Sequence, residues 1–443
     1  MHAITPSLPT PAPGKRALYV LDGGMGTTLQ APPFNLALDS ALWSSELLAS
    51  QSGRDQLVRL HDTWIEAGAD IVQTCTYQST LPLFLPASDL ESPQAHSTAL
   101  KTMTAALPVA AQSASSAPQG SGSQPRRARV ALSLGPYGSS LSPGQEYTGA
   151  YPPPFGPSET AARDAKPGCS QQALEACPLP LEQISPAENH SATADDEAER
   201  YLAAWHLQRL QQFSSSAEWS SEIDILAFET VPSLAEIRAI RRAMHAFTAS
   251  RDGAAAVPFY ISLVFPRTSD SDSAVRFPDP ALAHLVTLQD QMPLLVQTAL
   301  GSLGSDYARP GGLGFNCTSP LHAKRVVGLL SRHVRDQLAQ SGSGSDDAAA
   351  DAEKPWLFVY PDGGAVYDVV SRSWHHPTGL TDSSWAALVA DAVADAVPPV
   401  PAALAQGEAT GTPWAGVVVG GCCKAGPSAI KALRQEVEKR QWR

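Results

Sequence analysis

Residues 57–76, LVRLHDTWIEAGADIVQTCT, contain a helical pattern and a strand pattern that meet at one turn. The first part has apolar residues at the period of about 3.6 residues that an amphipathic helix requires: Leu57, Leu60, Trp64 and Ile65. The small residues at 67–69 end this helix, and the apolar run that begins at Asp70 is typical of a buried strand. A helix that leads directly into a buried strand predicts part of a parallel β/α sheet.

Short apolar runs that end in small or polar residues recur along the whole chain. Eight of them are candidate strands: residues 17–22, 70–76, 130–135, 223–230, 259–265, 312–317, 356–361 and 416–422. A second helical pattern, formed by Leu234, Ile237 and Ile240, follows the fourth run. Apolar strands that alternate with helices predict an α/β protein, and eight of them favour a closed (β/α)8 TIM-type barrel. An open doubly wound sheet is the competing arrangement.

The chain has 443 residues, which is long for one domain, but barrels of this type range from about 200 to over 400 residues. Three stretches are rich in Ala, Ser, Gly, Pro or acidic residues and have few apolar anchors: residues 105–129, 152–196 and 339–354. Such compositions bury too little apolar area to offset the entropy of ordering, so we expect disordered or irregular loop insertions there. Residues 1–443 are therefore expected to form a single barrel domain.

Composition excludes several classes of protein. Hydrophobic residues make up 43% of the chain, which is enough to bury a large core. Lys and Arg total 31 against 43 Asp and Glu, and no basic cluster is present to bind the phosphates of a nucleic acid. No apolar run approaches the about 20 residues of a membrane helix, and residues 1–16 lack the apolar core of a signal peptide. We expect a soluble cytoplasmic protein.

Three of the six cysteines lie where two candidate strands end. Cys317 closes the run 312–317, and the adjacent Cys422 and Cys423 close the run 416–422. The carboxyl ends of barrel strands converge on one face, so these three thiols can meet there. Three cysteine ligands leave one of the four zinc positions open for substrate, which predicts a catalytic zinc site. Small buried thiols are the alternative, and no role is assigned to the remaining cysteines, Cys75, Cys169 and Cys177.

Two carboxylates also lie at candidate strand ends. Asp22 stands in LDGGMGTT, where glycines allow a ligand to approach the backbone and the carboxylate can accept a hydrogen bond from an ammonium group. An ordinary strand-to-helix turn is the alternative. Glu229 lies in an apolar run, and a buried carboxylate must be paired or functional because an unpaired one is costly. A structural ion pair is the alternative for Glu229.

With these motifs in place, the chain resembles the homocysteine S-methyltransferase family of zinc-dependent thiol methyltransferases. The shared motifs run nearly end to end: LDGGMGTTLQ from Leu21, LWSSELL from Leu42, AGADIVQTCTYQST from Ala67, GPYGSSLSPGQEYTGAY from Gly135, DILAFETVPSLAE from Asp224, GFNCTSP from Gly314, VYPDGGAVYD from Val359 and GGCCKAGPSAIKAL from Gly420. The sequence departs from the family pattern in two loops. SLVFPRTSD, at residues 262–270, follows it less closely, and PDGG from Pro361 replaces a more usual Asn-Ser-Gly.

The resemblance implies a role for several residues. It implies that Cys317, Cys422 and Cys423 bind zinc. It places Asp22 and Glu229 in the amino-acid pocket as catalytic and substrate-binding residues, with Glu229 holding the substrate ammonium. Three further positions are implied to contact substrate: Asn316 beside a ligand cysteine, and Trp43 and Tyr77 on the side of the methyl donor. Core packing is the alternative for the two aromatic residues.

The activity implied by the resemblance is transfer of a methyl group to the thiol of homocysteine, which yields methionine and serves methionine biosynthesis. TYQST and EYTGAY are in the style of the branch that uses S-methylmethionine, and S-adenosylmethionine is the second donor considered. Zinc would lower the thiol pKa, which is near 8.5 when free, so that the acceptor binds as a nucleophilic thiolate. The alternatives are methylation of another thiol or a selenol such as selenocysteine, a zinc-binding scaffold, and a zinc hydrolase.

Overall fold

The computed structural model describes residues 17–85, 88–115, 127–157, 164–165, 177–184, 194–250, 257–267, 275–341, 354–368, 373–375, 379–398 and 411–442. All eight expected strands form one parallel sheet in the order β1-β12-β9-β8-β7-β6-β3-β2. Their bounds are β1 Leu18–Val20, β2 Ile71–Gln73, β3 Arg129–Leu134, β6 Ile225–Val231, β7 Phe259–Val264, β8 Gly312–Asn316, β9 Trp356–Tyr360 and β12 Gly416–Val419. The expected strand positions are therefore confirmed, with ends that shift by a few residues.

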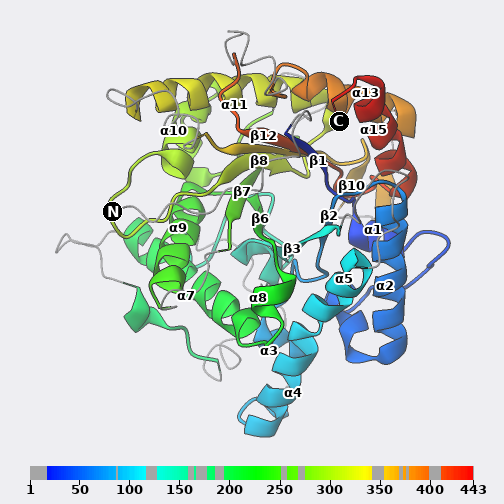
Figure 1. Cartoon of the computed structure of the whole chain (residues 1–443). Coiled ribbons are helices and arrows are strands. Elements are labelled where there is room, and N and C mark those ends of the chain that lie inside the picture. The colour runs from blue at the N-terminus through cyan, green and yellow to red at the C-terminus, as the bar shows by residue number, and fades with distance from the viewer. Residues whose placement is uncertain are drawn as a thin grey trace.

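The sheet closes on itself, which excludes the open doubly wound arrangement. A parallel bridge pairs Leu21 with Ile71. Next to it, the backbone N–H of Asp70 donates to the carbonyl of Val20 at 2.6 Å. These contacts join β1 to β2, the two ends of the strand order, and the strands lie at the centre of a ring of helices (Figure 1). The (β/α)8 barrel is confirmed.

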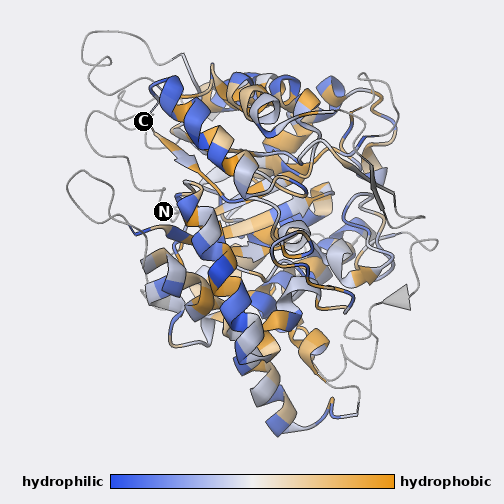
Figure 2. Cartoon of the chain, turned by 90° about the vertical axis from the view of Figure 1, so that its right-hand side faces the viewer, coloured by the Kyte–Doolittle hydropathy of each residue, from blue (hydrophilic) through white to orange (hydrophobic). Residues whose placement is uncertain are grey.

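One long helix covers the barrel after each strand. These helices are α2 Gln51–Glu66, α5 Ala106–Ser115, α7 Ala194–Ser214, α9 Leu234–Ala249, α10 Leu288–Leu300, α11 Pro320–Ser341, α13 Asp382–Val393 and α15 Pro427–Lys439. Further elements lie in the connections: α1 Met25–Leu29, η1 Trp43–Ala49, α3 Leu81–Phe84, α4 Pro93–Thr104, η2 Tyr137–Ser140, η4 Leu181–Gln183, α8 Trp219–Glu222, η5 Pro280–Leu282, and the strands β4 Leu141–Ser142, β5 Asp164–Ala165, β10 Val366–Asp368 and β11 Ser373–His375. Helices carry hydrophobic and hydrophilic faces, as expected when one face packs on a sheet (Figure 2).

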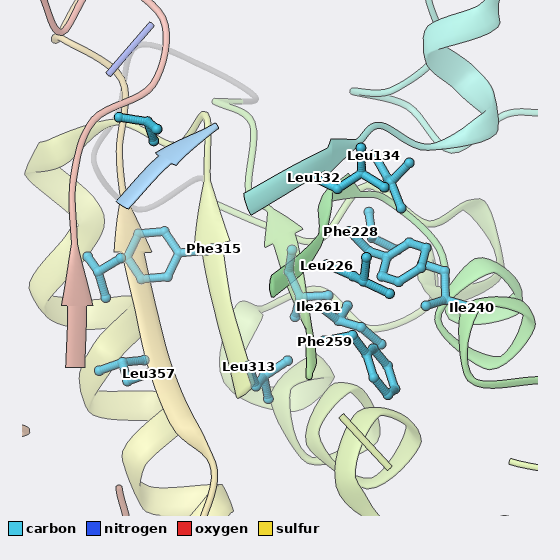
Figure 3. Close-up of a cluster of buried hydrophobic side chains, with 14 of the residues drawn as sticks. Leu132, Leu134, Leu226, Phe228, Ile240, Phe259, Ile261, Leu313, Phe315 and Leu357 are labelled. Atoms are coloured by element: carbon cyan, nitrogen blue, oxygen red, sulfur yellow. The ribbon is translucent and has the colours of Figure 1, made fainter. Parts of the chain in front are cut away.

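Side chains alternate between two cores along each strand. Leu226, Phe228, Phe259 and Ile261 point outward and pack against helices, where Ile240 of α9 meets them (Figure 3). The residues between them point into the barrel and form a second core, which consists of Tyr19, Leu21, Ile71, Ala131, Ile225, Ala227, Tyr260, Trp356, Phe358, Tyr360 and Val418. Stacked aromatic rings fill this interior, with 3.7 Å between the ring centroids of Tyr260 and Phe358. A filled interior leaves the carboxyl ends of the strands as the place for a site.

The expectation of an irregular insertion at residues 105–129 is wrong in its first part. Residues Ala106–Ser115 form helix α5, whose Ala110 and Ala114 are fully buried. Alanine has the highest helix propensity, and its small side chain lets this helix pack closely on α2, so low complexity here does not mean irregularity.

The other two expected insertions are described only in part. Within residues 152–196, the segment 177–184 and the start of α7 are ordered, and residues 339–341 belong to α11. Residues 116–126, 158–163, 166–176, 185–193 and 342–353 lie outside the described residues. No helix among those described is long and apolar enough to cross a membrane.

Candidate active site

The three predicted cysteines meet at the carboxyl end of the barrel. Cys317 follows β8, Cys422 and Cys423 follow β12, and their sulfur atoms all lie within 4.8 Å of one another. The structure joins Cys317 and Cys422 by a disulfide and leaves Cys423 as a free thiol. A form that binds a metal through all three sulfurs therefore requires this disulfide to be reduced.

The donor set fits a soft divalent cation. Burial raises the pKa of the Cys423 thiol to about 12 even with Lys424 nearby, so without a metal cation this group stays protonated at neutral pH. Three thiolates this close repel one another unless a cation lies between them. Sulfur ligands of this kind favour zinc over hard cations such as magnesium. Among the described residues, this is the one group of His, Cys, Asp or Glu side chains close enough to hold a metal ion.

The glycines after β1 make room for the cysteine loop. A Cβ atom on Gly24 would lie 2.5 Å from the carbonyl oxygen of Cys422, and one on Gly23 would lie 2.2 Å from that of Ala425. The N–H of Gly24 donates to the carbonyl of Ala425 at 3.1 Å. These glycines therefore make room for the backbone that carries two of the cysteines, and the approach of a ligand to this turn stays a prediction.

Gly24→Ala should weaken metal binding by displacing this loop. The added methyl group must move the Cys422 carbonyl, at a cost of about 1–3 kcal/mol. We expect reduced zinc content after dialysis and a lower midpoint of thermal unfolding. Gly328→Ala is the matched control, since its Cβ would meet nothing within 4 Å in helix α11 and should stabilise the helix by up to about 1 kcal/mol. Equal zinc content in both variants would show that the glycine contact does not position the ligands.

Asp22 lies at the bottom of the same face, where it is 1% exposed. Its Oδ2 accepts a hydrogen bond from the backbone N–H of Gln73 at 2.8 Å, whereas its Oδ1 has no hydrogen-bond partner. Burial, with a further contribution from the charge of Glu229, raises the pKa of Asp22 well above its usual value. This carboxylate therefore has one oxygen available for a buried cationic ligand.

Glu229 is held beside Asp22 by neutral donors. The side-chain amide of Gln73 donates to its Oε1, and the Ser133 hydroxyl donates to its Oε2 at 2.5 Å. Burial raises the pKa of Glu229, and hydrogen bonds from Ser133, Gln73 and Tyr360 oppose that rise. No ion pair to Glu229 is present among the described residues, so the structural ion pair considered for it is not found. Two buried carboxylates here share no basic partner.

Asn316 links the carboxylates to the cysteines. Its side-chain amide donates to the Thr230 hydroxyl at 2.7 Å, its Oδ1 accepts from the Thr230 N–H at 2.8 Å, and its Nδ2 lies 3.9 Å from the Cys422 sulfur. Thr230 and Cys317 both have positive φ, 57° and 46°, which is rare for residues other than glycine. Such strained backbone is concentrated at functional sites. Here the two hydrogen bonds with Asn316 hold the backbone of Thr230 in this conformation.

The two predicted donor-side aromatics have different surroundings. Tyr77 is half-buried, and its phenol is close enough to Thr230 and to Glu229 for both to affect its pKa, which burial raises well above its usual value. Trp43 is also half-buried, but its ring lies against Gly26, where a Cβ would be 2.0 Å from a ring atom. The structure therefore brings Tyr77 to the carboxylate group, whereas the contacts of Trp43 are those of a packing residue.

Several residues of the site were missed from the sequence. Gln73, Ser133 and Tyr360 surround Glu229, and all three lie in the predicted strands. A glutamine and a serine in otherwise apolar strands were the available signal, because a polar side chain that points into a barrel needs a partner.

Buried polar side chains outside the barrel anchor the loops above it. Glu236 of α9 accepts hydrogen bonds from the Tyr137 N–H at 2.7 Å and the Tyr151 hydroxyl at 2.6 Å. Arg209 of α7 donates to the carbonyls of Gly135 at 2.7 Å and Tyr77 at 3.2 Å. The loops after β2 and β3 are thus held in place by side chains of the surrounding helices α7 and α9.

A closed (β/α)8 barrel with a thiol cluster and two buried carboxylates at its carboxyl end defines a barrel enzyme with a candidate metal centre. The family described as homocysteine S-methyltransferase matches residues 19–437. The chain belongs to this family of methyltransferases, whose substrates are small molecules.

Relatives of known function cover nearly the whole chain. Homocysteine S-methyltransferase 2 of Zea mays is 24% identical over 421 residues, which are 95% of this chain and 90% of that protein. Homocysteine S-methyltransferase of Escherichia coli strain K12 is 26% identical over 421 residues, 95% of each chain. Crystal structures of the Escherichia coli homocysteine methyltransferase MmuM, described as the oxidized and metallated forms, superpose with TM-scores of 0.51 and 0.50. Both are 20% identical, cover 95% of this chain and 96% and 97% of their own, and support the fold.

Proposed function

We propose that this enzyme transfers a methyl group from S-methylmethionine, or from S-adenosylmethionine, to the thiol of homocysteine and so produces methionine. The observation that carries the proposal is the pair of buried acids Asp22 and Glu229 on the same barrel face as the cysteines. Among the described residues, no basic side chain pairs with either acid. The carbonyl of Asp22 accepts a hydrogen bond from Gly421, the residue before Cys422, at 3.0 Å. An acceptor that carries both an ammonium group and a thiol matches both halves of this site.

The carboxylates bind the ammonium end of homocysteine. Oδ1 of Asp22 is available, and Glu229 is oriented by Gln73 and Ser133. Burial raises the pKa of both acids. An ammonium group that binds beside them favours their ionised form and so lowers both pKa values again. Hydrogen bonds between ionised partners are about twice as strong as neutral ones. The amino acid is thereby fixed with its side chain directed toward the thiol cluster.

Cys317, Cys422 and Cys423 would hold zinc, leaving one coordination position for substrate. When bound there, zinc lowers the pKa of an acceptor thiol and so supplies a thiolate at neutral pH. Asn316, which lies 3.9 Å from the Cys422 sulfur, orients this part of the site.

The reaction is an in-line displacement. The homocysteine sulfur, having lost its proton, forms a bond to the methyl carbon, and the bond from that carbon to the donor sulfur breaks with its electron pair going to the donor sulfur. The donor sulfonium becomes a neutral thioether. The barrel contributes alignment, because holding both reactants in a near-attack geometry removes much of the entropic barrier.

Methionine formation by the reduced, zinc-loaded enzyme tests the proposal. With homocysteine and S-methylmethionine, two methionine molecules should appear per turnover, one from each substrate, whereas S-adenosylmethionine should yield one. Treatment with a chelator should stop the reaction and added zinc should restore it. If reduced and metal-replete protein makes no methionine with any donor, the proposal is wrong.

A further inference from the structure

Asp362 lies in the loop after β9, beside the third cysteine. The N–H of the next residue, Gly363, donates to the carbonyl of Cys423 at 2.7 Å, and the Asp362 N–H donates to the carbonyl of Thr318 at 3.0 Å. The Oδ1 of Asp362 accepts from the N–H of Gly364 at 2.7 Å. The backbone hydrogen bonds therefore fix Asp362 against the loop that carries Cys423.

Glu146 and Tyr147 reach the same place from the loop after β3. The loop is tied down by the bond from Gln145 N–H to the Gly138 carbonyl at 2.9 Å, and beyond it by the bond between Tyr151 and Glu236. The Glu146 carboxylate folds back over Gly144, where a Cβ would lie 2.3 Å from Oε2. Tyr147 keeps 41% of its surface exposed, although it belongs to an anchored loop.

The carboxylates of Asp362 and Glu146 lie near the same two side chains, those of Cys423 and Tyr147. The charges of Asp362 and Glu146 both reach the Cys423 sulfur, and both reach the Tyr147 phenol. Glu146 also interacts with Tyr77. Lys424 and Arg267 are the basic residues whose charges reach Cys423 and Asp362 respectively. The space beside Cys423 is thus bordered by two carboxylates and by the Tyr147 phenol, and Tyr77 lies between this region and Glu229.

We propose that Asp362 and Glu146, together with Tyr147, bind the methyl donor and select donors of net positive charge. The inference rests on the proposed methyltransferase function and names residues for its second substrate. A sulfonium amino acid has a net charge of about +1, and its cationic groups suit carboxylates and the faces of aromatic rings. Glycine betaine, by contrast, carries a carboxylate close to its quaternary nitrogen, which Asp362 and Glu146 would repel.

The chemistry predicts how this selection appears in kinetics. The donor sulfur loses its positive charge as the methyl group leaves, so the carboxylates stabilise the bound donor at least as much as the transition state. Removing one of them should raise the donor KM and leave kcat unchanged or higher.

Asp362→Asn provides the test, because it removes the charge and leaves the size of the side chain nearly unchanged. We expect the KM for S-methylmethionine to rise about tenfold, while zinc content and the KM for homocysteine stay unchanged. Activity with glycine betaine relative to S-methylmethionine should increase. Glu146→Gln should shift the same ratio in the same direction. Asp391→Asn is the control, since it removes an equal charge on the outer side of α13, where Asp391 pairs with Arg440 at 2.7 Å.

The outcomes separate this inference from the proposed function. An unchanged donor preference in both variants, or equal rises in the two KM values, would overturn the donor assignment while methyl transfer itself stands. No methionine from the wild-type enzyme with any donor would instead remove the function on which the assignment rests. If Asp362→Asn loses zinc or fails to fold, the donor ratio of Glu146→Gln decides.

Discussion

Cys317→Ala, Cys422→Ala and Cys423→Ala should each lose nearly all bound zinc and nearly all methyl transfer. Even the loss of a residue that only supports a ligand costs about 10- to 100-fold in metal affinity, so the loss of one of three ligands should cost more. The sulfurs lie within 4.8 Å of one another, and no other described cluster can replace the missing one. Zinc content after dialysis of the reduced proteins is the measurement.

Cys75→Ala is the matched control for this series. Cys75 is a buried free cysteine two residues after β2, and it lies outside the cluster. It should keep its zinc and differ from wild type only in stability. Full zinc retention by any of the other three variants would remove that residue from the ligand set. Reduction is required for the wild type, Cys75→Ala and Cys423→Ala, because in these proteins the disulfide between Cys317 and Cys422 withdraws two sulfurs.

Glu229→Gln should keep zinc and fold, but it should bind homocysteine about 10- to 150-fold more weakly. This range corresponds to the about 1.5–3 kcal/mol of a hydrogen bond to a charged partner. The amide keeps the shape of the side chain, and Gln73 and Ser133 can rotate to bond it. Calorimetric titration of the zinc-loaded enzyme with homocysteine measures the change directly.

A thiol of similar size without the amino group is the internal control for Glu229. This thiol has no ammonium group for Glu229 to bind. Its affinity, although lower than that of homocysteine, should therefore be nearly the same for the wild type and for Glu229→Gln. Equal losses for homocysteine and for this thiol would mean that Glu229 supports the structure of the pocket, and its assignment as the ammonium ligand would then be withdrawn.

The barrel was predictable because its signals are local. Apolar runs and helical periods are read within a few residues, and the cysteines could be placed together because barrel strands converge at their carboxyl ends. The partners of Glu229 were not predictable in this way. Ser133 of β3 and Gln73 of β2 reach Glu229 of β6 because these strands are neighbours with a particular register, which no single stretch of sequence encodes.

One local interpretation was wrong and a second was incomplete, each for a physical reason. Helix α5 was missed because its alanines resemble a low-complexity linker until another helix is available to pack against. The glycines after β1 were correctly identified as sites of close approach, but what approaches them is a backbone segment about four hundred residues later in the chain, at Cys422 and Ala425. Such a contact forms only when β1 pairs with β12 in the closed barrel, so no local stretch of sequence predicts it.

The pairing of β1 with β12 also bears on biosynthesis. The proposed metal site takes one cysteine from the turn after β8 and two from the turn after β12, and this second turn packs on Gly23 and Gly24 just after β1. A polypeptide still emerging from the ribosome, or one clipped before β12, contains Cys317 but no complete ligand set. Acquisition of the metal therefore coincides with closure of the barrel. We expect truncated or half-made chains to be fully inactive, with no partly working form.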